Sequence, residues 1–260
     1  MTDDELAARR IIMMHTPLDL LTMAETVDLA KGAMTSRRRL QQVVINVAKV
    51  VNMRSNPDLQ MDVTDSDVIS IDGMGVLWAA RLLGFDAKER VTGIDLMHAL
   101  IACFARNGFK PYFLGAREDI LQKAMANFRQ SHPGLEIAGY RNGYFIKDEE
   151  DQVVTDIRNS GADCLFVAIS TPMKERFLHQ HRDQLGVPYL MGVGGSLDVV
   201  AGEVSRAPLW MQKRGLEWLY RLLQEPRRMW RRYLVTNTKF AFLLLFALIS
   251  KRLSRTMPNS

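Results

Sequence analysis

The sequence predicts a Rossmann-like α/β domain of three layers with a mostly parallel sheet, followed by a basic and apolar helical appendage. Two features predict the domain. Short apolar segments rich in Val, Ile and Phe alternate with amphipathic segments of helical period. The stretches between strands are also long enough to hold the helices that connect parallel strands. A third feature, the basic and aromatic composition after residue 205, predicts the appendage, so we divide the chain into a core, 1–205, and an appendage, 206–260.

The predicted elements follow in order from a helix over 20–33. Apolar, β-branched runs bounded by glycine or polar residues predict strands at 42–47, 68–71, 110–115, 135–140, 163–170 and 188–193. Apolar residues recurring every three or four positions predict helices at 48–53, 76–84, 96–104 and 118–128, with two more beginning near Asp148 and Thr171. Because strands and helices alternate, we expect helices on both faces of the sheet.

Composition restricts the class of protein. The 260 residues, 47% of them hydrophobic, can bury one substantial core. Cys103 and Cys164 stand in apolar runs, which suits reduced buried thiols better than a disulfide framework. The acidic start differs from the basic start of a signal peptide, so we expect a cytoplasmic protein. The sequence has no dinucleotide-binding glycine motif, no P-loop and no nucleophile elbow, and its five histidines suggest no metal site.

In the stretch 67–84, a predicted strand, an acidic turn and a predicted helix follow one another directly, with no linking residues between them. The run 68–71 is followed by Asp72 and Gly73, and then by an apolar helix-like segment. In an open α/β sheet, ligands bind just outside the carboxyl ends of the strands, where the Asp72 carboxylate can act on a substrate. Gly73 lets the backbone turn sharply and leaves room for a ligand. The spacing leaves one alternative equally open, in which Asp72 is the N-cap of its own helix.

Other predicted strands also end in polar residues or glycine. Asn46 ends the first predicted strand, where it either contacts a ligand or makes a turn, and the turn is favoured by the residues alone. Gly115 ends the strand at 110–115. Arg90 precedes a helix, and it either binds a phosphate or stands in a solvated loop.

Basic and aromatic residues are concentrated in the appendage. Arginine and lysine outnumber acidic residues there, and an almost uninterrupted apolar run fills 240–249. This composition suits an anionic partner. Ten residues are too few to cross a bilayer, which needs about 20. We therefore expect helices that lie on the cytosolic leaflet of a membrane. The alternative is a helical hairpin packed on the core or on a second subunit of a homo-oligomer.

Seven segments in order resemble the WecG/TagA/CpsF glycosyltransferases over about residues 40–235. They are Asp72-Gly73-Met74-Gly75-Val76, Arg90-Val91-Thr92-Gly93-Ile94-Asp95-Leu96, Phe113-Leu114-Gly115, Gly143-Tyr144-Phe145, Gly192-Val193-Gly194-Gly195-Ser196-Leu197-Asp198, Arg206-Ala207-Pro208-Leu209-Trp210 and Gly215-Leu216-Glu217-Trp218-Leu219-Tyr220-Arg221. Any one segment would be weak support, but their common order makes the resemblance specific.

The resemblance implies an inverting enzyme that moves a sugar from a UDP-sugar to a sugar linked through diphosphate to a membrane polyprenol, in the synthesis of cell-surface polysaccharide. It implies no cofactor and no bound metal ion. The aspartate of the Asp-Gly turn is the family's proposed general base, which here is Asp72. Without a metal, cations must stabilise the leaving UDP. The matching arginines are Arg90, Arg221, Arg228 and Arg231.

The resemblance also extends the set of expected substrate-binding residues. Those outside the arginine set are Asn46, Gly73, Asp95, Gly115, Lys174, Glu175, Gly194, Asp198 and Arg206. The chain departs from the family at two of the expected sugar contacts. Where the family has Thr-x-Asn, Val44 replaces the threonine, and where it has Pro-Lys-Gln-Glu, the chain has Pro172-Met173-Lys174-Glu175. The donor sugar is therefore open among N-acetylmannosamine-like sugars, hexoses and uronic acids.

Two other classes of function compete with the enzyme. A non-catalytic scaffold could keep the α/β fold and hold other polysaccharide enzymes at the membrane, and the missing threonine permits this. A nucleic-acid-binding module is suggested by the arginines and aromatics of the appendage. It is the weakest candidate, because the arginines alternate with an apolar face that a soluble nucleic-acid binder has no reason to expose.

Overall fold

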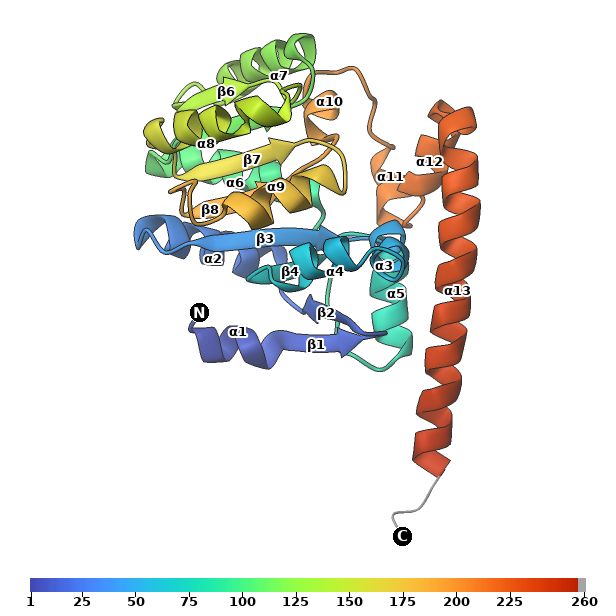
Figure 1. Ribbon diagram of the computed structural model, residues 1–260. Coiled ribbons are helices and arrows are strands. Elements are labelled where there is room, and N and C mark those ends of the chain that lie inside the picture. Colours follow the sequence, from blue (N-terminus) through green and yellow to red (C-terminus); the bar gives the residue numbers. More distant parts are fainter. Residues whose placement is uncertain (257–260) are drawn as a thin grey trace.

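The computed structural model describes residues 1–256, and within them all side chains except those of Asp3, Arg228 and 253–256. An eight-stranded sheet forms the middle layer of this part of the chain (Figure 1), with the strand order β1-β2-β4-β3-β8-β7-β5-β6. The strands are β1 Arg10–Met13, β2 Thr16–Asp19, β3 Leu40–Ile45, β4 Val68–Ile71, β5 Pro111–Gly115, β6 Gly139–Arg141, β7 Cys164–Ala168 and β8 Tyr189–Gly192. Only β1 pairs antiparallel with its neighbour among these strands.

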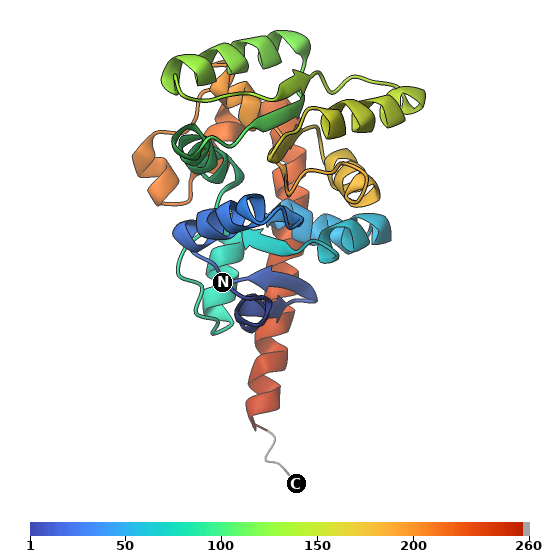
Figure 2. The same cartoon turned by 90° about the vertical axis from the view of Figure 1, so that its left-hand side faces the viewer.

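Helices cover both faces of the sheet (Figure 2), which confirms the predicted three-layer α/β class. One face is covered by α2 Met23–Thr35, α6 Gly93–Asn107, α7 Glu118–Ser131 and α10 Ser196–Val200. The other is covered by α3 Val47–Met53, α4 Pro57–Thr64, α5 Met74–Leu82, α8 Glu150–Asn159 and α9 Met173–His181. With helices on both sides, β4, β5, β7 and β8 are buried along their whole length, as parallel strands usually are. Cys103 and Cys164 are buried free thiols, as expected.

The N-terminal edge of the sheet differs from the prediction. The helix α1, Asp3–Arg9, and the hairpin of β1 and β2 lie before residue 20, where the sequence predicted no helix or strand. Buried Asp19 holds this hairpin in place: it accepts two hydrogen bonds of 2.8 Å from Arg10 and one of 2.7 Å from the backbone N–H of Ile69 in β4. The predicted strand at 135–140 is also wrong in its bounds, because only Gly139–Arg141 pair with β5.

The sheet register brings the predicted site to one edge. Ile45 of β3 lies opposite Ile71 of β4, so Asn46 and Asp72 leave neighbouring strands at the same level. On its other side β3 pairs with β8, although these strands are far apart in sequence. The strand that follows β3 in the chain, β4, lies on one side of β3, whereas β8 on its other side belongs to the second half of the sheet. A boundary of this kind is where open α/β sheets form a crevice at the carboxyl ends of the strands.

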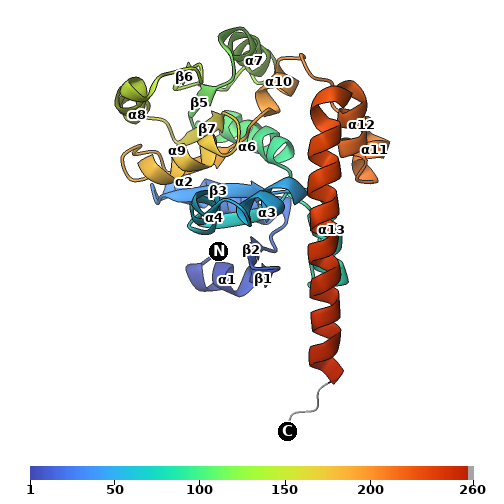
Figure 3. The same ribbon diagram turned by 45° about the vertical axis from the view of Figure 1, so that its right-hand side comes forward.

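Three helices of the appendage stand at this carboxyl edge, toward which the arrows of β3 and β7 point (Figures 1 and 3). They are α11 Leu209–Lys213, α12 Glu217–Gln224 and α13 Pro226–Thr256. The long α13 packs on α3 and α12. Its Phe240 is buried in the apolar cluster that also contains side chains of α3 and α5. Nearer the C-terminus, Lys251 donates a hydrogen bond to the carbonyl oxygen of Leu83.

The structure changes the interpretation of the apolar run at 240–249. The run continues a longer helix, and its segment Met229–Arg252 is long and apolar enough to cross a membrane by length and composition alone. The argument from a ten-residue length is therefore wrong. In the structure 11% of that segment is buried, and its buried residue Phe240 lies in the cluster that α3 and α5 also form. One side of α13 packs on the core, as the hairpin alternative predicts, while Phe242, Leu245, Phe246 and Ile249 are exposed.

Candidate active site

The turns after β3 and β4 are in direct contact. The backbone N–H groups of Asp72 and Gly73 donate to the carbonyl oxygen of Ile45, at 2.9 and 3.2 Å. A Cβ atom on Gly73 would lie 3.1 Å from Cα and Cβ of Asn46. Since the φ of Gly73 is −82°, this close approach explains the glycine, and a sharp backbone turn does not. Asn46 is the N-cap of α3, where its Oδ1 accepts from the N–H of Lys49 at 3.1 Å.

Asp72 does not cap its own helix. The N-cap of α5 is Gly73, and Asp72 instead faces the first turn of α6, where its Oδ1 accepts from the N–H of Gly93 at 3.1 Å. This corrects the alternative in which Asp72 is the N-cap of α5. Burial raises the pKa of Asp72, while the Gly93 hydrogen bond and the charges of Arg90 and Lys49 oppose this rise. A carboxylate with a raised pKa is a stronger base, and the N-terminus of α6 still favours its ionised form.

Next to the Asn46 turn lies a buried cluster of three charged side chains. Glu175, 3% exposed, accepts at the same oxygen, Oε1, from Lys49 Nζ at 2.8 Å and from Lys174 Nζ at 2.9 Å. Burial would raise the pKa of Glu175, but the charges of both lysines and their hydrogen bonds lower it to about 2. Burial and the charge of Lys49 lower the pKa of Lys174 to about 8, against the opposing effect of Glu175. Lys49 and Lys174 are 6% and 9% exposed.

The turn between β8 and α10 completes this side of the edge. Gly194 has a φ of +52°, in the left-handed region that favours glycine. A Cβ atom on the next residue, Gly195, would lie 3.2 Å from Oδ2 of Asp198 and 3.6 Å from Nη2 of Arg221. Arg221 belongs to α12, so the appendage brings a guanidinium directly over this turn. The structure thus brings Gly194, Asp198 and Arg221 together at this turn.

Two predicted arginines are engaged by carboxylates. Arg206 forms a bidentate ion pair with Asp95, at 2.5 and 2.8 Å, and its Nε lies 3.2 Å from Glu217. Arg90 pairs with Glu217 at 2.5 Å and donates to the carbonyl oxygen of Gln212 at 3.2 Å. Burial would raise the pKa of Asp95, but the hydrogen bonds from Arg206 and Thr92 lower it. Asp95, Arg206, Glu217 and Arg90 therefore form one network that holds the appendage to the start of α6.

The remaining predicted residues are distributed along the edge. Gly115 ends β5 with a φ of +108°, and a Cβ there would lie 2.7 Å from the carbonyl carbon of Ala168 at the end of β7. The close approach of the β7 backbone therefore leaves no room for a side chain at residue 115. Arg231 is exposed on α13. Arg228 is in the same helix, and its side chain lies outside the described part of the structure.

Lys49 and Arg232 were not selected from the sequence. Lys49 stands in an apolar helical pattern, where a lysine is usually solvated, and only the fold brings it to Glu175. Arg232 is one of several arginines in α13 and had no distinguishing neighbour in the sequence. In the structure it is close enough to Lys174 to lower the pKa of that lysine. The one feature of the sequence that could have pointed to Lys49 is its position three residues after Asn46, at the end of a predicted strand.

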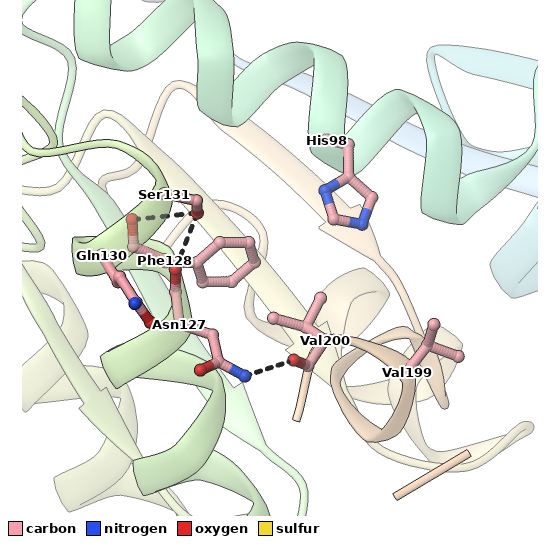
Figure 4. Close-up of a pocket in the computed structure, with 7 residues that line it drawn as sticks. All are labelled: His98, Asn127, Phe128, Gln130, Ser131, Val199 and Val200. Atoms are coloured by element: carbon pink, nitrogen blue, oxygen red, sulfur yellow. Dashed lines mark hydrogen bonds between the residues drawn. The ribbon is translucent and has the colours of Figure 1, made fainter. Parts of the chain in front are cut away.

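A pocket of about 540 Å³ lies elsewhere, between α6, α7 and α10 (Figure 4). It is lined by His98, Asn127, Phe128, Gln130, Ser131, Val199 and Val200. The Asn127 amide donates to the carbonyl oxygen of Val200 at 2.8 Å across this pocket. Burial lowers the pKa of His98, so the lining is uncharged at neutral pH. The Asp72 carboxylate and the clustered cations lie instead at the carboxyl edge of the sheet, which is therefore the candidate site.

Fold and site together define a three-layer α/β protein with a carboxylate and several cations at the carboxyl edge of its parallel strands. A family model described as "Glycosyl transferase WecG/TagA/CpsF family" matches residues 11–254, and the chain belongs to that family. It is similar to two proteins named N-acetylglucosaminyldiphosphoundecaprenol N-acetyl-beta-D-mannosaminyltransferase. The protein of Bacillus spizizenii is 36% identical over 179 residues, 69% of this chain and 68% of the relative. The protein of Bacillus subtilis is 33% identical over 182 residues, 70% of each chain.

Proposed function

We propose that this chain is an inverting glycosyltransferase that moves a sugar from a UDP-sugar to a polyprenyl-diphosphate-linked sugar. The observation that carries the proposal is Asp72, a carboxylate of raised pKa that two neighbouring turns hold at the carboxyl edge of the sheet. The names of the two relatives support the acceptor, since both mention N-acetylglucosaminyldiphosphoundecaprenol. The proposed donor follows from the family resemblance and from the cations beside Asp72.

In the proposed reaction, Asp72 takes the proton from the attacking hydroxyl of the acceptor sugar. The hydroxyl oxygen forms a bond to the anomeric carbon of the donor while the bond from that carbon to the diphosphate oxygen breaks. The electron pair of the broken bond leaves with UDP, and one displacement inverts the anomeric centre. Arg221, Lys49 and Lys174 lie near enough to this edge to stabilise the charge that develops on UDP. Arg228 and Arg231 are the further candidates from α13.

We also propose that the protein works at the inner face of the plasma membrane as a peripheral protein. An acceptor with a polyprenyl chain is held in the membrane, so the enzyme must approach it there. The exposed residues Phe242, Leu245, Phe246 and Ile249 lie along α13, and basic residues precede them. Such an apolar and basic surface favours binding to an anionic leaflet.

The decisive experiment is the release of UDP by the purified full-length chain. It is supplied with N-acetylglucosamine linked through diphosphate to a short polyprenol, and with a panel of UDP-hexoses, UDP-N-acetylhexosamines and UDP-hexuronates. We expect acceptor-dependent UDP release with at least one donor, and a product of inverted anomeric configuration by NMR. If no donor reacts although the chain binds UDP and membranes, the result would favour the non-catalytic scaffold.

A further inference from the structure

The helix α5 carries an apolar stripe for which the proposed mechanism has no use. Met74, Trp78 and Leu82 are spaced four residues apart, so they lie on one face of this helix. Met74 is partly buried, whereas Trp78 and Leu82 are 49% and 63% exposed. Large apolar side chains that are exposed next to one another mark a surface that another molecule covers.

The stripe begins at the proposed catalytic turn. Met74 is the first residue of α5 and directly follows Asp72 and Gly73, and all three residues are partly exposed. Trp78 lies one helical turn beyond Met74. With the helical rise of 1.5 Å per residue, Leu82 lies about 12 Å along the helix from Met74. The stripe therefore leads away from Asp72 along the surface of the core.

The appendage meets the stripe at both ends. A Cβ atom on Gly215, in the turn between α11 and α12, would lie 2.4 Å from Cγ of Met74 and 3.3 Å from Cζ2 of Trp78, so this turn packs on both side chains. At the other end, Lys251 of α13 donates a hydrogen bond to the carbonyl oxygen of Leu83. The helices α5 and α13 stand side by side here (Figure 1). The appendage thus covers the start of the stripe and leaves the rest accessible.

Two cations stand beside the start of the stripe. Lys213 and Arg214 immediately precede Gly215 in the chain, and both are exposed. Glu217, which follows two residues after Gly215, is engaged by two other arginines of the network at the start of α6. Exposed cations suit a diphosphate, and an apolar stripe suits a hydrocarbon chain. A polyprenyl diphosphate carries both groups, one directly after the other.

We propose that Lys213, Arg214 and the stripe of α5 form the subsite for the polyprenyl diphosphate of the acceptor. This inference rests on the proposed function and deepens it. The hydroxyl of the acceptor sugar faces Asp72, and the diphosphate of the acceptor contacts the two cations. The first isoprene units of the chain run over Trp78 and Leu82. Because the stripe is short, it binds only the beginning of the chain, and the remainder stays in the membrane.

The test compares two acceptor analogues by calorimetry on the full-length protein. One is N-acetylglucosamine linked through diphosphate to farnesyl, and the other carries a methyl group in place of farnesyl. We expect the wild type to bind the farnesyl analogue at least about tenfold more tightly, since the chain covers apolar surface. Trp78→Ser combined with Leu82→Ser should remove this advantage and leave the affinity for the methyl analogue unchanged.

Further variants separate the two parts of the subsite. Lys213→Ser combined with Arg214→Ser should weaken the binding of both analogues about tenfold, the scale of lost charged hydrogen bonds. Because Trp78 contacts the turn at Gly215, Leu82→Ser is also measured alone, and it should weaken only the farnesyl analogue, at an unchanged melting temperature. Met61→Ser, at an exposed methionine of α4, is the matched control and should change neither affinity.

Other occupants of the stripe give different results. If the double variant of α5 keeps the farnesyl advantage and only binds anionic vesicles more weakly, the stripe contacts bulk lipid. If it keeps the advantage and only has a smaller mass by light scattering, a second copy of the chain covers the stripe. Either result overturns the subsite while the proposed function stands, as does a loss of the advantage that is accompanied by a lower melting temperature and absent from Leu82→Ser. If the wild type binds neither analogue, the proposed acceptor is wrong and the subsite fails with it.

Discussion

At the scale of single residues, Asp72 is the position with the sharpest consequence. Replacement by asparagine keeps the size of the side chain and an oxygen that can accept from Gly93, but it removes the basicity. We expect Asp72→Asn to lower turnover by about 10²-fold or more, as the loss of a general base does, with the affinity for UDP nearly unchanged. UDP release under saturating donor and acceptor measures the first quantity, and calorimetry measures the second.

The matched control for this substitution is Asp86→Asn, since Asp86 is exposed in the loop after α5. It should have wild-type turnover. A turnover of Asp72→Asn within about threefold of the wild type would mean that Asp72 only holds the start of α6, through its hydrogen bond to Gly93.

Glu175 makes the stability of the protein depend on pH. Its pKa of about 2 lies below the ordinary value of 4.5, so the folded state holds its carboxylate ionised more strongly than the unfolded chain does. A lowered pKa stabilises the fold above pH 4.5, and this contribution is lost as the pH falls from 4.5 toward 2. We expect Glu175→Gln to reduce the free energy of unfolding at pH 7 by about 3 kcal/mol or more, because it leaves two buried lysines unpaired.

Urea unfolding of the wild type and of Glu175→Gln at pH 7 and pH 3 measures this effect. The difference between the two proteins should shrink by about 2 kcal/mol at pH 3, since the wild type has lost part of its contribution there. Asp148→Asn, in an exposed acidic run, should give no such change. An equal difference at both pH values would contradict the role given to the Glu175 charge.

The sequence identified residues whose position along the chain is distinctive, and it missed those whose neighbours are distant. Asp72 could be selected because it directly follows an apolar strand and precedes glycine. Lys49 could not, since its partner Glu175 is more than one hundred positions away and the two meet only because β8 pairs with both β3 and β7. In the same way, the sequence offered Arg90 as a phosphate ligand or as part of a solvated loop, and it did not indicate the ion pair with Glu217.

At the scale of elements, burial decided which predictions held. The strands β3, β4, β5, β7 and β8 are almost entirely buried and were found within a few residues of their bounds. The hairpin of β1 and β2 was missed because Pro17 and the charged residues Arg10 and Asp19 interrupt the apolar pattern of a strand. The ion pair between Arg10 and Asp19 forms only in the folded hairpin. The three-residue β6 pairs only with β5, so its sequence carries little of a strand pattern.

The turn between α11 and α12 offers a test of how the appendage docks on the core. Gly215 has a φ of +72°, and a Cβ atom there would lie 2.4 Å from Cγ of Met74 in the first turn of α5. Gly215→Ala therefore combines backbone strain, about 1–2 kcal/mol, with a collision. We expect it to loosen α11 and α12 and to make the appendage sensitive to limited proteolysis.

Gly202→Ala separates the two causes. Its φ of +80° carries the same backbone strain, but no atom lies within 4 Å of the added Cβ. This variant should lose a few degrees of melting temperature and keep a protease-resistant appendage. Equal proteolysis of both variants would show that the contact with Met74 does not hold the appendage in place.

At the scale of the whole molecule, the appendage joins two surfaces that the core alone does not provide. The ion pairs Arg206–Asp95 and Glu217–Arg90 fix the appendage to the core near the start of α6. Its Arg221 reaches the turn after β8. Its other side presents large apolar residues along α13. Under the proposed membrane association, a membrane-bound acceptor would reach the site from the side of the appendage. The division at residue 205 remains a prediction, since α13 also packs into the core cluster through Phe240.

The two sides of α13 should respond differently to substitution. Phe242 and Phe246 are 67% and 73% exposed, whereas Phe240 is 6% exposed. In the full-length chain, Phe242→Ser combined with Phe246→Ser removes apolar surface that only a membrane or a partner would cover, at about 1.5–3 kcal/mol for each side chain. We expect binding to vesicles containing anionic lipid, measured by sedimentation, to weaken at least tenfold, with an unchanged melting temperature. Phe240→Ser should lower the melting temperature instead, because it opens a cavity against α3 and α5. If the double variant still bound vesicles like the wild type, the lipid-binding surface would have to lie away from this face of α13.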